Sequence, residues 1–164
     1  MKSKQKGNKF ERDICKMISL SFSNNADDNI FWRTQSSGGR FTQRKKLGKN
    51  TEGQAGDITY TNIIGKPLID RYYIELKAYS NIDIWSLITK KESKSLYGFL
   101  KSTYDLASVE NKIPVLIVKQ NNKPIIVFTT EYDETKLILQ YKYKNQLFYM
   151  YLIDDFLNSF VKQI

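Results

Sequence analysis

The stretch Arg71–Ser80, RYYIELKAYS, has the alternating composition of a β-strand and carries a carboxylate and an ammonium two residues apart. Because successive side chains of a strand point to opposite faces, Glu75 and Lys77 share one face while Ile74 and Leu76 share the other. The strand therefore presents a charged pair on one side and apolar side chains on the other. Which chemistry uses such a pair depends on the rest of the chain.

Length, composition and charge indicate a folded protein with a polyanionic partner. The 164 residues are 41% hydrophobic and 26% charged, which predicts a single domain spanning residues 1–164. Lys and Arg number 26 against 17 Asp and Glu, a net charge of +9. Such an excess favours binding to the phosphates of nucleic acid. A coding bias toward Lys is the alternative, but the clustering of the positive charge favours nucleic acid.

The residue types that are missing exclude several chemistries. The sequence has no His and one Cys, Cys15, which excludes Ser-His-Asp and Cys-His catalysis and a zinc site of four Cys or His ligands. A metal ion would need oxygen ligands, which favours Mg²⁺, with Mn²⁺ as a substitute. No apolar run reaches the length of a membrane span, and the N-terminus lacks an apolar signal core. We therefore expect a soluble, intracellular, cytoplasmic protein that does not bind a membrane.

Residues 8–22 have the period of a helix with an acidic residue on its apolar side. The apolar positions that fall on one side are Phe10, Ile14, Met17, Ile18 and Phe22. Glu11 falls within this arc, where a carboxylate must be paired, protonated or bound to a metal. The alternative is a Glu at the edge of the arc that reaches solvent or pairs with a neighbouring Lys.

A basic loop is predicted after a short strand at 29–34. Residues 35–54, QSSGGRFTQRKKLGKNTEGQ, are nearly free of apolar side chains and predict a mobile loop. The basic residues in and before this loop, which we expect to contact DNA phosphates, are Arg33, Arg40, Arg44, Lys45, Lys46 and Lys49. A surface loop without a role is the alternative.

Residues 56–79 predict an antiparallel hairpin. Asp57 opens its first strand, Gly65-Lys66-Pro67 is a turn signal, and the second strand contains Glu75. The return of the chain would bring the carboxylates of Asp57 and Glu75 together.

The remaining chain completes a mixed α/β pattern. We expect a helix at 93–110, a central strand covered on both faces at 113–120, a strand at 125–130, a hairpin around Lys144-Asn145 and a terminal helix at 154–164. Residues 137–164 are expected to supply additional core or a dimer contact.

In this order the elements resemble the PD-(D/E)XK nuclease superfamily, with Gly56-Asp57 and Glu75-Leu76-Lys77 as the motif. Within it the sequence is most similar to archaeal-type Holliday-junction resolvases, through KGNKFERD at 6–13 and RTQSSGGR at 33–40. The likeness covers residues 1–130, and the C-terminal extension at 131–164 has no counterpart. Gly56 stands where the motif has Pro.

The resemblance implies a restriction-endonuclease-like fold, with a central mixed sheet flanked by helices, and a Mg²⁺-dependent endonuclease for branched DNA that acts as a homodimer. Two alternatives stay open. One is a restriction-like or recombination nuclease acting on duplex DNA or ends, because fold and metal site do not fix the substrate. The other is a basic DNA-binding protein without catalysis.

The predicted site combines metal ligands with a lysine. Asp57, Glu75 and the backbone carbonyl of Leu76 are oxygen ligands suited to Mg²⁺, and the resemblance adds Glu11 as a metal or water ligand. We expect the three carboxylates to converge on one cation, and Lys77 to lie over the attacking water with a pKa lowered by that ion. The resemblance also implies that a serine of the loop assists near the scissile phosphate, and the two candidates are Ser36 and Ser37.

Overall fold

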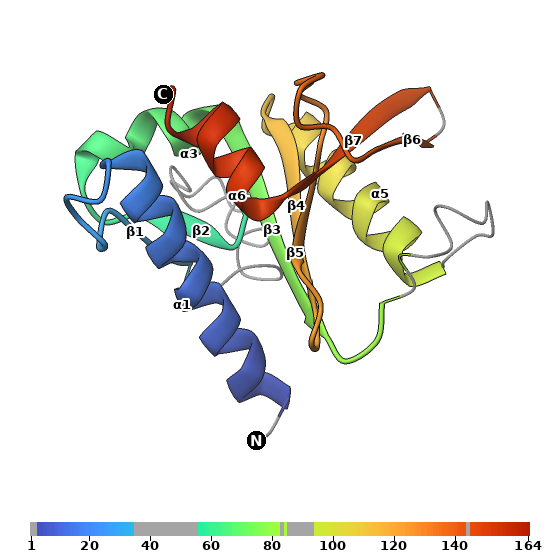
Figure 1. Ribbon diagram of the computed structural model, residues 1–164, viewed down its shortest axis with the longest axis horizontal. Helices are drawn as coiled ribbons and strands as arrows, with labels where there is room; N and C mark the ends of the chain where they lie inside the picture. The colour runs from blue at the N-terminus through green and yellow to red at the C-terminus, as the bar shows by residue number, and fades with distance from the viewer. Residues whose placement is uncertain (1–2, 35–55, 83, 85–93, 144) are drawn as a thin grey trace, which may run out of the picture.

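The fold is a mixed sheet with helices on both faces (Figure 1). The structure, a computed structural model, describes residues 3–34, 56–82, 84, 94–143 and 145–164. Its mixed five-stranded sheet flanked by helices confirms the predicted fold class, and it is consistent with a restriction-endonuclease-like architecture.

The order of the strands in the main sheet is β3-β4-β5-β7-β6. Their bounds are Tyr72–Tyr79 for β3, Ile113–Gln120 for β4, Ile125–Thr129 for β5, Leu139–Tyr143 for β6 and Gln146–Leu152 for β7. Strands β3 and β4 are parallel, and the other neighbours are antiparallel. A parallel pair needs a crossover connection, and α5, Lys94–Val109, lies in this one. The predicted helix at 93–110 and the hairpin at Lys144-Asn145 are thereby confirmed.

Strand β4 divides the core into two layers. Val115 and Ile117 join the cluster that contains α1, while Leu116 and Val118 join the cluster that contains α5. All four side chains are fully buried. An apolar run without alternation is expected for a strand covered on both faces, so the prediction for residues 113–120 is confirmed.

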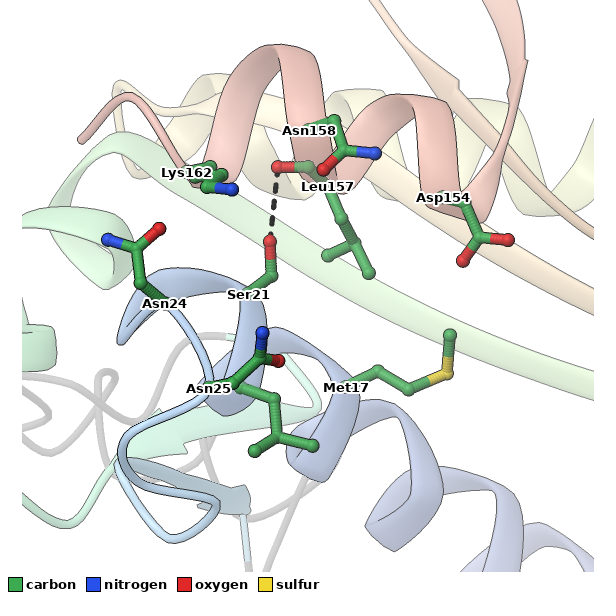
Figure 2. Close-up of a pocket in the computed structure, with 9 residues that line it drawn as sticks. Met17, Ser21, Asn24, Asn25, Asp154, Leu157, Asn158 and Lys162 are labelled. Atoms are coloured by element: carbon green, nitrogen blue, oxygen red, sulfur yellow. Dashed lines mark hydrogen bonds between the residues drawn. The ribbon is translucent and has the colours of Figure 1, made fainter.

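Helix α1, Ser3–Phe22, covers one face of the sheet together with the C-terminal segment. That segment forms α6, Ile153–Phe156, which continues as one turn of π-helix at Leu157–Val161. Both pack in the same cluster as α1, and Ser21 Oγ donates a hydrogen bond of 3.3 Å to the Leu157 carbonyl (Figure 2). The C-terminal extension is therefore part of the core. None of the described helices is long and apolar enough to cross a membrane.

The predicted hairpin at 56–79 is wrong. Strand β2, Ile58–Tyr60, pairs antiparallel with β1, Phe31–Arg33, and not with β3. A 3₁₀ turn, Ile63–Gly65, and the short helix α3, Lys66–Arg71, connect β2 to β3. The Pro interpreted as a turn signal lies in the first turn of α3, where its missing N–H leaves no helical hydrogen bond unmade.

Candidate active site

Asp57 is fixed against the outer edge of β3 by two hydrogen bonds. Its N–H donates to the Ile74 carbonyl at 2.8 Å, and its Oδ2 accepts from the Leu76 N–H at 2.8 Å. The residue is buried, with 7% of its surface exposed. Asp57 thus satisfies backbone groups that an edge strand would otherwise leave unpaired. The expected proximity of Asp57 to the Glu75 strand is found, although it does not come from a hairpin.

Gly56 permits this close approach. Its φ is +85°, and a Cβ placed there would lie 2.6 Å from the Ile74 carbonyl oxygen. A side chain would therefore be strained by its own backbone and would also clash with β3. Proline, which the motif has here, holds φ near −65°, so the departure from the motif follows from the backbone conformation of this chain.

Glu75 and Lys77 lie side by side on the α5 face of β3. The Lys77 ammonium donates to Glu75 Oε1, and the Tyr73 hydroxyl donates to Glu75 Oε2 at 3.4 Å. The side chains of Glu75 and Lys77 are 18% and 24% exposed, so both are largely screened from water. This confirms the expected sharing of one face by alternation.

The two carboxylates and one ammonium give the site an excess of negative charge. Burial raises the pKa of Glu75, and the negative charge of Asp57 raises it further, against the opposing effect of Lys77. Burial by itself lowers the pKa of Lys77. The negative charge of Glu75, its hydrogen bond to the ammonium and the negative charge of Asp57 together outweigh burial, so the pKa of Lys77 is raised. Both groups therefore hold protons more tightly than usual. The expected lowering of the Lys77 pKa presupposes a bound divalent ion.

Glu11 lies on the other side of the β3 edge. Its Oε2 is 3.0 Å from Arg33 Nη1 in an ion pair whose side chains are 26% and 30% exposed. Helix α1 packs against the Ile74 and Leu76 face of β3, whereas Glu75 points toward α5. The partly buried carboxylate on the apolar arc is thus compensated by a cation from β1.

Three charged side chains, those of Glu11, Arg33 and Asp57, act on the buried thiol of Cys15. Burial and the negative charge of Glu11 raise the pKa of Cys15 to about 12, with Arg33 lowering it and Asp57 raising it. The negative charge of Asp57 therefore acts on the Cys15 thiol, which also senses Glu11 and Arg33, and on Glu75.

The expected convergence of three carboxylates on one ion is not found. Within the part of the chain that the structure describes, no three acidic, Cys or His side chains lie close enough to hold a metal ion together. Asp57 and Glu75 are neighbours, but Glu11 is engaged by Arg33. The physical reason is that α1 and the Glu75 side chain lie on opposite faces of β3.

Thr34 is a site residue that the sequence did not indicate. Its N–H donates to the Asp57 carbonyl at 2.9 Å, while its buried Oγ1 has no hydrogen-bond partner among the residues that the structure describes. Unpaired buried hydroxyls are costly and rare in native structures. A threonine at a strand end carries no signal that distinguishes it from an ordinary β residue.

Several predicted residues lie outside the described residues. These are Ser36, Ser37, Arg40, Arg44, Lys45, Lys46 and Lys49. Of the predicted phosphate contacts, only Arg33 belongs to the part that the structure describes.

Oxygen atoms that could bind a metal ion lie along the outer edge of β3. A residue in a strand directs its N–H and its carbonyl toward the same side, and the Leu76 N–H points to Asp57. The Leu76 carbonyl therefore faces the same edge as the Asp57 carboxylate. Carboxylate and carbonyl oxygens of this kind are the ligands that Mg²⁺ and Mn²⁺ take.

A separate hollow between α1 and the C-terminal helix contains none of the predicted site residues. It has a volume of about 330 Å³. Figure 2 shows Ser21, Asn24, Asn25 and Lys162 around it. The motif residues Asp57, Glu75 and Lys77 thus lie at the β3 edge and not around this hollow.

A protein-family sequence model matches almost the whole chain. The sequence model of a family described as phage putative PDDEXK endonuclease matches residues 2–161. The match extends over the C-terminal segment, for which the sequence had suggested no counterpart. Neither the curated proteins nor the solved structures give a significant match.

Proposed function

The chain belongs to the phage putative PDDEXK endonuclease family, and on this premise we propose that it is a Mg²⁺-dependent DNA endonuclease with its active site at the outer edge of β3. Membership makes the chain a nuclease of the PD-(D/E)XK superfamily, which has DNA as its substrate. Beyond this membership, we propose the metal, the site residues, the form of the DNA and the homodimer.

The observation that carries the proposal is the placement of Asp57 against Glu75-Leu76-Lys77. The site combines the carboxylates of Asp57 and Glu75 with the Leu76 carbonyl, which faces the edge of β3. Lys77 balances only part of the negative charge of the two carboxylates. A divalent cation would relieve the repulsion between Asp57 and Glu75. The donor set therefore fits Mg²⁺, with Asp57, Glu75 and the Leu76 carbonyl as its ligands.

Lys77 serves as a donor in this proposal. When bound, Mg²⁺ supplies charge neutralisation at the phosphate and a bound water of lowered pKa. The Lys77 Nζ can donate a hydrogen bond to the attacking water and stabilise the negative charge that develops on it. Glu75 holds the ammonium in place through Oε1.

Arg33 and Glu11 act on the substrate side of Asp57. Arg33 is partly exposed and supplies a guanidinium for a DNA phosphate, which it can bind in a bidentate fashion. Glu11 fixes Arg33 in the described conformation. A direct role of Glu11 at the metal or its water requires that Arg33 release it.

A branched substrate is proposed from the likeness of residues 6–13 and 33–40 to Holliday-junction resolvases. Two strands must be cut symmetrically at a junction, and this requires two copies of the site, hence the homodimer. The alternatives are a nuclease for duplex DNA or ends and a DNA-binding protein without catalysis.

The test incubates the protein with labelled four-way junction, duplex and single strand, in Mg²⁺, Mn²⁺ or chelator. Paired symmetric cuts at the junction in Mg²⁺, lost in chelator and in Glu75→Gln, support the proposal. Cleavage of uninterrupted duplex supports the first alternative. Binding without cleavage in either metal, unchanged in Glu75→Gln, supports the second.

A further inference from the structure

An aromatic pair continues the catalytic face of β3 beyond Lys77. Tyr79 is the last residue of β3 and shares the face of Glu75 and Lys77 by alternation. Its ring lies on Phe99 of α5, with centroids 5.3 Å apart and planes at 26°. We refer to this pair, Tyr79 and Phe99, as the stack.

The stack is connected to the proposed site. Lys77 Nζ lies 5.8 Å from the centroid of the Phe99 ring, a cation-π distance. A continuous strip therefore runs along this face. It begins with the charged side chains of Glu75 and Lys77 and ends with the aromatic rings of Phe99 and Tyr79. At about 3.3 Å per residue, Tyr79 follows Lys77 by about 7 Å along the strand.

Core packing explains Phe99 but not Tyr79. Tyr79 is 49% exposed, although its ring is supported from one side. Six other aromatic pairs of the described residues meet edge-on or tilted, at 39° to 89°. The stack instead leaves a supported, nearly parallel aromatic face in the open beside Lys77. A planar partner is the group that such a face accommodates best.

We propose that the stack binds an unpaired DNA base next to the phosphate that is cleaved at the proposed site of Asp57 and Glu75. This inference rests on the proposed function and narrows its substrate class. Base stacking on aromatic side chains tolerates every sequence, because each base has a π-face. A base inside an uninterrupted duplex is already stacked and must be extruded first, which is unfavourable. The stack therefore favours cleavage where a base is free, as at a branch, a flap or a single strand.

The first test measures binding without catalysis. The full chain is titrated in chelator with a single-stranded oligonucleotide carrying 2-aminopurine, and with the same strand in a duplex. We expect the wild-type protein to change the 2-aminopurine fluorescence of the single strand. Tyr79→Ala should remove that change and lower single-strand affinity on the order of 10-fold, with duplex affinity nearly unchanged.

Three further variants separate stacking from folding. Tyr79→Phe keeps the ring and should restore binding, while Tyr79→Leu keeps the apolar contact with Phe99 and should not. Tyr132→Ala removes an aromatic that is 56% exposed and packs on Tyr149 of β7, and should have no effect. Thermal unfolding checks that each variant is folded.

Two outcomes would overturn the inference. One is a folded Tyr79→Leu variant with wild-type affinity and fluorescence change on the single strand. The other is an equal loss on single strand and duplex, which would mean general electrostatic or structural damage. Because this test needs no metal, it is independent of cleavage. A wild-type protein that cuts no DNA in Mg²⁺ or Mn²⁺ would refute the proposed function while leaving the binding result intact.

Discussion

Asp57 accepts the Leu76 N–H at 2.8 Å through Oδ2, so the first carboxylate of the motif is hydrogen-bonded to the centre of the second motif element. The contact joins two segments that do not pair as strands. It also turns Asp57 and the Leu76 carbonyl toward one edge, beside Glu75 and Lys77. The geometry of the motif is thus set by a side chain that completes the hydrogen bonding of an edge strand.

Glu75→Gln is expected to stabilise the protein in chelator while abolishing cleavage. The substitution leaves one carboxylate, Asp57, facing one ammonium, Lys77. It removes the burial of a charged group and the repulsion by Asp57, which together raise the Glu75 pKa. We expect a rise in Tm of about 2–4 °C for each kcal/mol regained. Adding Mg²⁺ should raise the Tm of the wild-type protein more than that of the variant. Asp105→Asn, at an exposed ion pair with Lys101, is the control and should change the Tm little.

The same substitution gives a pH dependence of known sign. Because the pKa of Glu75 is raised in the folded protein above its ordinary 4.5, the folded state binds this proton more tightly than the unfolded chain. The free energy of unfolding contributed by Glu75 therefore falls as pH rises above that value. The difference between wild type and Glu75→Gln should grow from pH 4 to neutral pH in denaturant titrations. A difference that shrinks over this range would contradict the sign.

Gly56→Ala is expected to destabilise the protein and disturb the site. A Cβ would meet the Ile74 carbonyl oxygen at 2.6 Å, and the φ of +85° is unfavourable for a side chain. We expect a loss of about 1–3 kcal/mol or more in the free energy of unfolding. Gly98→Ala is the matched control, because nothing lies within 4 Å of its Cβ in helix α5. That variant should gain up to about 1 kcal/mol, since Ala is the better helix former.

Two Thr→Val substitutions should have opposite effects on stability. Thr34 has a buried hydroxyl without a partner among the described residues, so Thr34→Val removes a desolvated polar group and should raise the free energy of unfolding by about 1 kcal/mol. Thr103 donates to the Phe99 carbonyl at 2.8 Å, and Thr103→Val should lose a similar amount. Equal losses in both variants, measured by urea unfolding, would show that Thr34 is hydrogen-bonded in solution.

Periodicity predicted the elements whose burial depends on their own sequence. Strand β4 and helices α1 and α5 were found because a continuous apolar run and a period near 3.6 each specify one environment. The pairing of β2 with β1 was missed, because an Asp followed by a strand and a Gly-Lys-Pro signal suits a hairpin as well as a helix start. Choosing between them depends on contacts that are distant in sequence.

The sequence predicts which residue types form the site better than it predicts how they are arranged in space. Alternation alone places Glu75 beside Lys77. The position of Glu11 on an apolar arc predicted a need for compensation, but not that Arg33 supplies it. Which face of β3 receives α1 is decided by packing across the whole sheet, so the separation of Glu11 from Glu75 had no local signal.

The Glu11–Arg33 pair predicts separable effects on DNA binding and on cleavage. Arg33→Gln removes a proposed phosphate contact, so it should weaken binding to all DNA forms alike and reduce the salt slope of log K by about one. Glu11→Gln removes the charge that holds the guanidinium and keeps only a neutral acceptor, so binding should be unchanged or tighter. Fluorescence anisotropy at several salt concentrations measures both, and Lys101→Gln, at an exposed pair on α5, is the control.

Cleavage then distinguishes the two roles open to Glu11. If the carboxylate only holds Arg33, Glu11→Gln retains cleavage at saturating DNA, because the amide oxygen can still accept from Arg33 at a similar distance. If the carboxylate joins the metal or its water once DNA has taken Arg33, Glu11→Gln loses cleavage by an order of magnitude or more, as removal of a charge-stabilising group does, while DNA affinity is kept. A double-mutant cycle in the absence of DNA should give a coupling of about 0.2–1 kcal/mol, as for partly exposed pairs. A much larger coupling would mean that the pair is a structural element of α1 and not a contact that DNA can exchange.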